Sequence, residues 1–323
     1  MEDRKRGVFM MKNPYTKKKP GYFRCELRKI RKNPELYLLL VLPLAIVVIF
    51  KLTPLYWLKI AFLQYNPFKG ISGSKYVGLA QFERIFTDME ALRAMRNTLI
   101  ISLYRFVVLF PAPIILALML NEVRSMGYKR TIQTIVYLPH FLSWVVAGSI
   151  LITLLSYNGG LINELFRKWN ITPVNFLSDK TKFRTILVVS AAWKDVGWNS
   201  ILYLAAITGI DPMLYEAAEI DGAGRMRKIW SITLPGIADT IVVLMLIRIG
   251  SMMASNMDQV LMLYNPLVYE TGDVIDTYVF RQGISKMEYS FSTAVGLFNS
   301  VVGFLLLVIS NAISRKVADR SIW

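Results

Sequence analysis

The strongest constraint on this chain is the recurrence of apolar runs that are long enough to cross a membrane. The first run contains "LYLLLVLPLAIVVIF" at 36–50, and comparable runs recur through the rest of the chain. A membrane-spanning helix needs about 20 mostly apolar residues. We therefore predict an all-α integral membrane protein with six spans, at about 36–58, 97–120, 131–155, 185–208, 237–255 and 290–313.

The distribution of positive charge predicts the orientation of these spans. Twelve of the 38 Lys and Arg residues precede the first span, and three more lie in each of the segments 121–130, 211–236 and 314–323. Loops on the cytoplasmic side are enriched in Lys and Arg. We therefore expect both termini and the 211–236 segment to face the cytoplasm. The net charge of +16 then reflects topology and contact with anionic membrane lipid, and nucleic acid is not expected as a partner.

The sequence offers almost no ligands for a metal or a prosthetic group. One histidine and one cysteine, Cys25, are too few for a zinc, haem or iron–sulfur site. No G-x-x-x-x-G-K-[ST] loop is present, so the chain itself cannot hydrolyse ATP. His140, Asp195 and Cys25 lie in three different segments, without the spacing of a catalytic triad. We therefore expect no catalytic residue, no metal site and no cofactor bound by this chain, which is not predicted to be an enzyme.

A polar stretch, "YEAAEIDGAGRMRKIWSITLPGI" at 215–237, interrupts two of the most apolar parts of the chain. Asp211–Pro212 is a strong helix start, Gly222 and Gly224 are expected to turn the chain through positive φ, and Pro235 is expected to end a second short helix. These residues predict a two-helix hairpin that is too small to be stable alone. Two interpretations follow from the residues: an amphipathic hairpin on lipid headgroups, or a docking element for a cytoplasmic protein.

The same stretch resembles the "EAA" motif of bacterial ABC importer permeases. That motif reads EAA, three residues, G, nine residues, I, one residue, L and P, and every fixed position matches here. The resemblance implies that the segment 211–236 is a coupling helix seated in a cleft of a separate ATPase subunit, which uses ATP and Mg²⁺. The residues assigned to this coupling are Glu216, Ala217, Ala218, Asp221, Gly222, Arg225, Ile232, Leu234 and Pro235.

The resemblance extends over nearly the whole chain after about residue 34. Stretches such as "QYNPFKGI" (64–71) and "YLPHFLSW" (137–144) are similar to a subgroup of carbohydrate permeases associated with uronate-containing oligosaccharides, such as aldouronate, pectin or alginate fragments. The basic tail at 1–35 carries no signature of this subgroup and is assigned from its charge alone. For the rest of the chain the resemblance implies a six-span permease domain of the type I importer fold at 36–323, with the transmembrane core at about 93–313. It also implies a bacterial cell membrane location, a second related permease, an ATPase dimer and an extracytoplasmic sugar-binding protein.

Charged side chains inside the predicted spans are candidates for the substrate route, because an unpaired charge facing lipid is unfavourable. The candidates, with neighbouring aromatic and amide side chains suited to a sugar, are Arg105, His140, Trp193, Lys194, Asp195, Trp198, Asn199 and Arg248. The excess of basic groups predicts an anionic sugar, and a neutral oligosaccharide is the alternative. Structural roles stay open: the arginines pairing with the partner permease, the tryptophans packing helices, and His140 marking a kink.

Two further points remain open in the sequence. The aromatic and acidic loop 256–289, predicted to be external, suits either a docking surface or a lid packed on its own spans. A proton-coupled secondary transporter would need carboxylates inside the spans. Asp195 is the one that qualifies, and it has a lysine beside it, so the ABC importer is the preferred function.

Overall fold

The computed structural model describes residues 34–254 and 257–318. Most of the predicted basic tail therefore lies outside the described residues. Contacts divide the chain into two units, one ending at Trp57 and one starting at Leu58, and each is described by itself.

The first unit is an apolar helix with irregular turns. It comprises α2 (Pro34–Val47), the π-helical turn η1 (Val48–Leu52) and the start of the 3₁₀ helix η2 (Thr53–Phe62). Pro54 has no backbone N–H to donate within the helix, and π-helical and 3₁₀ turns commonly occur where a helical hydrogen bond is missing. Next to it, the backbone N–H and the hydroxyl of Thr53 both donate to the Val48 carbonyl, the hydroxyl at 3.0 Å. Nearly all assessed side chains of α2 and η1 are exposed, as expected of a helix whose surroundings are lipid.

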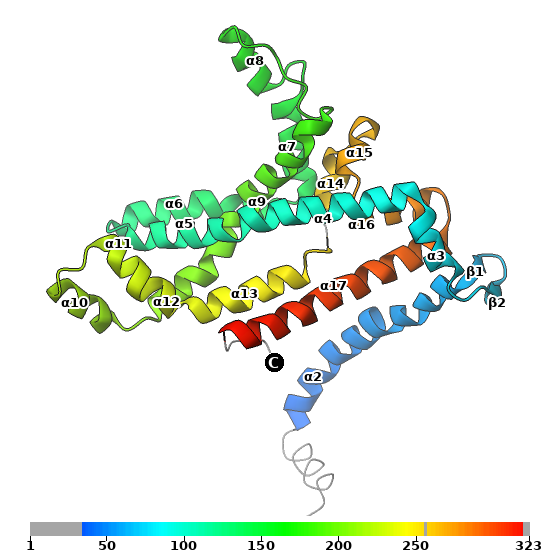
Figure 1. Cartoon of the computed structure of the whole chain (residues 1–323), viewed down its shortest axis with the longest axis horizontal. Helices are drawn as coiled ribbons and strands as arrows, with labels where there is room; N and C mark the ends of the chain where they lie inside the picture. The colour runs from blue at the N-terminus through cyan, green and yellow to red at the C-terminus, as the bar shows by residue number, and fades with distance from the viewer. Residues whose placement is uncertain (1–33, 255–256, 319–323) are drawn as a thin grey trace, which may run out of the picture. The chain divides into compact units, whose positions relative to one another are not determined.

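The second unit begins with a β-hairpin and a long helical run. Strands β1 (Leu63–Asn66) and β2 (Gly70–Tyr76) pair antiparallel, with Leu63 opposite Tyr76. Helix α3 (Ala80–Thr87) leads into α4 (Met89–Leu109) and α5 (Pro111–Glu122). The Asp88 carboxylate caps α4 by accepting from two backbone N–H groups at 2.9 Å. The hairpin and α3 lie at the opposite end of this unit from α10 and α11 (Figure 1).

The predicted span 131–155 is not one straight helix. Helix α6 (Met126–Tyr137) continues into the 3₁₀ turn η3 (Leu138–Phe141), and α7 (Trp144–Leu155) then departs at 103°. Two local features explain the break. Pro139 stands at the start of η3, and the Ser143 hydroxyl caps α7 by accepting from the Val146 N–H at 3.3 Å. The short helix α8 (Leu161–Lys168) follows before α9 (Lys180–Thr208).

The remaining elements are mostly short. They are α10 (Pro212–Ile220), α11 (Arg225–Lys228), η4 (Ile229–Thr233), α12 (Leu234–Gly236), α13 (Ala238–Gly250), α14 (Met257–Leu263), η5 (Pro266–Val268), α15 (Tyr269–Gly272), α16 (Ile275–Phe280), η6 (Arg281–Ser285) and α17 (Tyr289–Ala318). The fifth predicted span is shorter than expected, since α13 ends at Gly250.

Length and composition agree with six spans. Within residues 34–254 and 257–318, three helices are long and apolar enough to cross a membrane, namely Leu38–Phe62, Met89–Glu122 and Tyr289–Lys316. Three bent pairs pass the same test together, namely Met126–Phe141 with Trp144–Leu155, Lys180–Thr208 with Pro212–Ile220, and Arg225–Gly236 with Ala238–Gly250. The fold is that of the predicted all-α membrane protein.

Helix α9 is the centre of the second unit and packs against α4, α5 and α6 (Figure 1). Gly197 permits the closest of these approaches, because a Cβ added there would lie 2.0 Å from the Val136 carbonyl oxygen of α6. Apolar clusters hold the other contacts. Tyr203 and Ile207 of α9 pack with Ala117 of α5 and Ile237, and Phe183 and Leu187 pack with Ile101 of α4.

The loop predicted at 256–289 folds onto its own chain. Val260, Val268 and Val274 are buried against α4 and α9, and Tyr278 is buried against α3, α4 and α17. The loop is therefore packed on its own spans, while Leu267 and Ile284 stay exposed on it, and its use as a docking surface stays a prediction.

Candidate functional site

A polar cavity lies between α4, α9 and α13 and brings together four of the residues predicted from the sequence. Arg105, Asp195 and Arg248 line a space of about 200 Å³. Asn199 and Arg248 line an adjoining space of about 200 Å³, and the two spaces share Leu109, Arg248 and Ser251. Arg105, Asp195 and Arg248 were predicted one by one from charge inside apolar runs, and Asn199 was predicted as a nearby amide donor. The packing of α4, α9 and α13 brings the four together.

Helix α13 ends at Gly250, and the residues at this end line the cavity. Backbone carbonyls beyond a helix end need partners when they are buried. The carbonyl of Met252 accepts from the Ser102 hydroxyl of α4, and that of Met253 accepts from the Asn299 amide of α17 at 3.1 Å. The chain can therefore leave its helix after Gly250, which places Arg248 in the last helical turn beside the cavity.

The charge in the cavity is positive. Two guanidinium groups and one carboxylate line it. Among the described residues, neither Arg105 nor Arg248 has a carboxylate oxygen within 4.0 Å. Arg105 instead donates to the neutral side chain of Gln259. Because the positive groups are not neutralised by a close ion pair within this part of the chain, the cavity suits an anion.

His140 lies beside the cavity and contacts Asp195 directly. Its Nδ1 lies 3.2 Å from the Asp195 carboxylate, and its ring stacks on Trp198 with the centroids 4.6 Å apart and the planes at 4°. His140 belongs to η3, so it also stands at the break between α6 and α7. The structure thus gives this residue both the kink position and a polar contact to the cavity.

Lys194 has a different environment from its neighbour Asp195. Its side chain is buried, and its ammonium donates to the carbonyls of His140 at 2.6 Å and Leu142 at 2.5 Å. These carbonyls are freed where η3 ends, and Lys194 satisfies them. The geometry is that of a structural cation. Lys194 does not line either of the two polar cavity spaces.

Trp193 also lies away from the polar cavity. It lines a separate apolar space of about 480 Å³ with residues of α7, α8 and α9. At about 100° per residue, Trp193 and Asp195 point roughly 200° apart around α9. Neighbours in the sequence therefore face different surroundings, and of the two predicted tryptophans it is Trp198 that lies near the polar cavity.

Gln259 and Ser102 are functional candidates that sequence reasoning missed. Gln259 fell in a segment predicted to be an external loop, where a polar side chain is expected and does not stand out. Among the described residues, no group of three His, Cys, Asp or Glu side chains is placed to hold a metal ion.

The hairpin at 211–236 begins at the predicted Asp211 and turns at the predicted Gly222, whereas the prediction of positive φ was wrong for Gly224, whose φ is −70°. The Asp211 carboxylate caps α10 by accepting from the Met213 N–H at 2.9 Å. At the other end Gly222 has φ +73°. The Ala223 N–H donates to the Ala218 carbonyl at 2.8 Å, and the Gly222 N–H donates to the Glu219 carbonyl at 3.0 Å. These two bonds form a Schellman motif, in which glycine is favoured at the left-handed position.

The second half of the hairpin differs from its prediction. Pro235 does not end the helix, which continues to Gly236 before a 62° bend. The π-helical turn η4 ends at Thr233, two residues before Pro235. A wider turn of this kind lets a helix continue past a proline, which has no N–H to donate.

Side-chain bonds tie the two halves of the hairpin together. The hydroxyls of Tyr215 and Thr233 lie 2.9 Å apart, and Lys228 donates to Glu219 at 2.5 Å. The hydrogen bond from Lys228 lowers the pKa of Glu219. The Arg225 guanidinium approaches Glu122 of α5 at 4.0 Å.

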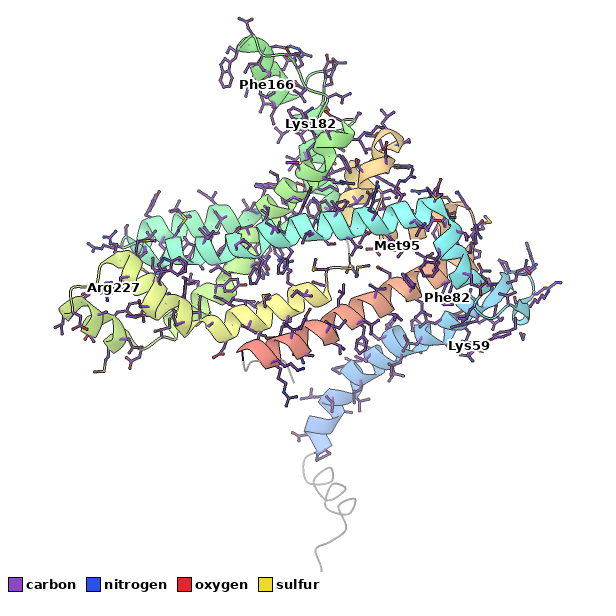
Figure 2. The ribbon with its side chains drawn as sticks, viewed as in Figure 1. Lys59, Phe82, Met95, Phe166, Lys182 and Arg227 are labelled. Atoms are coloured by element: carbon purple, nitrogen blue, oxygen red, sulfur yellow. The ribbon has the colours of Figure 1, made fainter. Side chains whose placement is uncertain are left out.

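The predicted coupling residues lie mostly on the surface of this hairpin, where Arg227 is also seen (Figure 2). Those that are exposed are Glu216, Ala217, Asp221, Gly222, Arg225 and Pro235, and those that are partly buried are Ala218, Ile232 and Leu234. Ala218, Asp221 and Ile232 line a shallow space of about 180 Å³ between the two halves. The hairpin therefore presents small and charged side chains together on a surface that a protein can contact closely.

Comparison with known proteins gives consistent matches. Residues 110–319 match the family described as binding-protein-dependent transport system inner membrane component. The polygalacturonan/rhamnogalacturonan transport system permease protein YteP of Bacillus subtilis (strain 168) is 41% identical over 297 residues, which is 92% of each chain.

Two crystal structures contain a similar chain. One is of a bacterial ABC transporter involved in the import of the acidic polysaccharide alginate, with a TM-score of 0.83 at 40% identity over 90% of this chain and 98% of that chain. The other is of a bacterial alginate ABC transporter in complex with an alginate pentasaccharide-bound periplasmic protein. Its TM-score is 0.84 at 39% identity, over 91% of this chain and 99% of that chain.

Proposed function

Because this chain belongs to the family of binding-protein-dependent transport system inner membrane components, we propose that it is a permease subunit of an ABC importer for uronate-containing oligosaccharides. A second, related permease completes the route across the membrane. A periplasmic or other extracytoplasmic binding protein delivers the sugar. A separate ATPase dimer, which uses ATP and Mg²⁺, docks on the hairpin at 211–236 in the cytoplasm.

The observation that carries this proposal is the connection between the hairpin and the cavity. Helix α9, which bears Asp195, turns by 70° into α10. Helix α12, on the far side of the hairpin, turns by 62° into α13, which bears Arg248. A force applied to the hairpin therefore acts directly on two helices that line the cavity. Closure of an ATPase dimer would move these helices as rigid elements and switch access to the cavity.

The cavity supports an acidic substrate. A sugar carboxylate placed there meets Arg105 and Arg248, and a guanidinium matches a carboxylate in charge and in planar geometry. Trp198 supplies an apolar face suited to a pyranose ring. The names of the relatives given above refer to polygalacturonan, rhamnogalacturonan and alginate, and all three are acidic polymers that contain uronate residues.

The coupling part of the proposal is tested by co-purification of the tagged chain with its neighbouring permease and ATPase. Glu216→Lys places a positive charge on the exposed face of α10 and is expected to release the ATPase while the permease pair survives. Glu83→Lys makes the same charge change on exposed α3, at the other end of the unit, and should retain the ATPase. ATPase retention by both variants, or its absence from the wild type, would refute the docking role.

The substrate part is tested separately by uptake in cells. The wild type should take up galacturonate or guluronate oligosaccharides faster than neutral xylo-oligosaccharides of equal length. Equal uptake of both classes would contradict an acidic substrate while leaving the importer assignment intact.

A further inference from the structure

Gln259 stands where the segment after α13 meets the cavity. It belongs to α14, and none of its side chain is exposed. Its neighbour Met262 packs against Gly148 of α7 so closely that a Cβ at that glycine would lie 2.9 Å from the Met262 Cβ. A polar side chain in such a tight setting must satisfy its hydrogen bonds within the protein.

The hydrogen bonds determine which way the Gln259 amide faces. Its Nε2 donates to the Leu187 carbonyl at 2.8 Å and to the Ser190 hydroxyl at 2.7 Å. The Ser190 hydroxyl uses its own proton on the Ile186 carbonyl at 2.6 Å, so its oxygen acts as an acceptor toward Gln259. Both partners on the α9 side are therefore acceptors, and only the NH₂ end of the amide can face them. The Gln259 oxygen must then face α4.

That oxygen accepts from Nη2 of Arg105. The Arg105 Nε is buried and has no hydrogen-bond partner among the described residues. The guanidinium is therefore held at one end by Gln259, while it lines the cavity with Asp195 and Arg248. An amide oxygen fixes the direction of a guanidinium without cancelling its charge, whereas a carboxylate of the same shape would form an ion pair with it.

We propose that Gln259 is a positioning residue for substrate selection: it orients Arg105 toward the cavity and, being neutral, leaves the charge of Arg105 available to a sugar carboxylate. This inference rests on the proposed function and adds a residue that sets the preference for acidic over neutral sugars. The chain Ile186–Ser190–Gln259–Arg105 links the backbone of α9 to the charge in the cavity.

The test is binding of two probes to the purified importer complex in the absence of the binding protein. The probes are a trigalacturonate and its carboxyl-reduced form, which has the same length and no charge. Gln259→Glu keeps the shape of the side chain and places a carboxylate beside Arg105. The ratio of affinities, acidic over reduced, is expected to fall about tenfold, corresponding to ~1.4 kcal/mol.

A double mutant separates positioning from a general effect on folding. If Gln259 acts through Arg105, adding Gln259→Glu to Arg105→Gln should leave the ratio where Arg105→Gln alone puts it. Ser190→Ala removes one of the bonds that orient the amide without adding charge, and it should lower the ratio by a smaller factor. This variant keeps the test valid should Gln259→Glu fail to assemble.

Three outcomes would overturn the inference. An unchanged ratio in both Gln259→Glu and Ser190→Ala, with a wild type that prefers the acidic probe, refutes the role of Gln259 and leaves the proposed function standing. If Gln259→Glu and Arg105→Gln change the ratio additively in the double mutant, the role of Gln259 is also refuted and the proposed function stands. A wild-type complex that binds both probes equally refutes the acidic substrate and this inference together.

Discussion

Replacing Gly222 by alanine tests how far the hairpin depends on one backbone conformation. Gly222 has φ +73°, and a Cβ added there would meet no atom within 4 Å. The substitution therefore introduces no clash, and its effect comes from the left-handed backbone alone. This isolates the Schellman turn from every side-chain contact of the hairpin.

The magnitude follows from two opposing terms. A left-handed conformation costs an L-residue roughly 1–2 kcal/mol relative to glycine. Alanine also has less conformational entropy than glycine in the open state of the turn, which stabilises the closed state by about 0.4–1 kcal/mol. The net destabilisation is about 1 kcal/mol, and since about 1.4 kcal/mol corresponds to tenfold, the turn should open roughly fivefold more often.

Hydrogen exchange at the Ala223 amide measures this opening, because that N–H donates to the Ala218 carbonyl only while the turn is closed. In Gly222→Ala the exchange should be about fivefold faster, and retention of the ATPase should weaken. Gly222→Asn should show a smaller effect, because asparagine tolerates the left-handed region better than alanine.

Gly224 provides the matched control. It is also exposed and also has nothing within 4 Å of an added Cβ, but its φ is −70°. Gly224→Ala should change the exchange of the turn little. Equal acceleration in Gly222→Ala and Gly224→Ala, or an asparagine variant as fast as the alanine one, would refute the argument from the backbone.

Three other predictions concern the cavity and the hairpin. Lys194→Met removes the donor from the partly buried carbonyls of His140 and Leu142, at roughly 1 kcal/mol each, so the yield of assembled complex and its melting temperature should fall, whereas Lys194→Arg should recover part of the loss. Trp198→Leu should reduce oligosaccharide uptake severalfold, while Trp193→Leu should affect uptake less, as measured with labelled substrate. The hydrogen bond from Lys228 lowers the pKa of Glu219. The ion pair therefore stabilises the hairpin fully above the usual glutamate pKa of about 4.3, and this stabilisation is lost as pH falls through the lowered pKa. Hydrogen exchange in the hairpin should accelerate over that acid range, and Glu219→Gln should remove the acid dependence.

The elements that depend on local chemistry were predictable from the sequence. Asp211 before Pro212 gave the start of α10, and Gly222 gave the turn, because capping and left-handed backbone are properties of single residues. The same reasoning failed at Pro235, since a π-helical turn absorbed the missing N–H and the helix continued. The sequence shows that Pro235 removes a backbone N–H, but whether the helix ends there or continues depends on the conformation of the neighbouring turns.

The site was predictable only in part. Arg105, Asp195 and Arg248 were found because a charge inside an apolar run is conspicuous. Their grouping, and the different surroundings of Lys194 and Trp193, depend on how α9 is rotated against α4 and α13. Gln259 left no signal, because its importance arises from bonds to Ser190 and Arg105, which are far from it in the sequence.

The close contact of Gly197 with the α6 backbone also fixes how the cavity can change its width. Helix α9 is unbroken over 29 residues, or about 43 Å at 1.5 Å per residue. No side chain fits between the two helices at Gly197, so a movement of α6 toward α9 would drive the Val136 carbonyl into the α9 backbone. His140 and Asp195 are therefore expected to move as one rigid body in the proposed transport cycle, and a motion carried from the hairpin would change the cavity by displacing that body relative to α13 and α4.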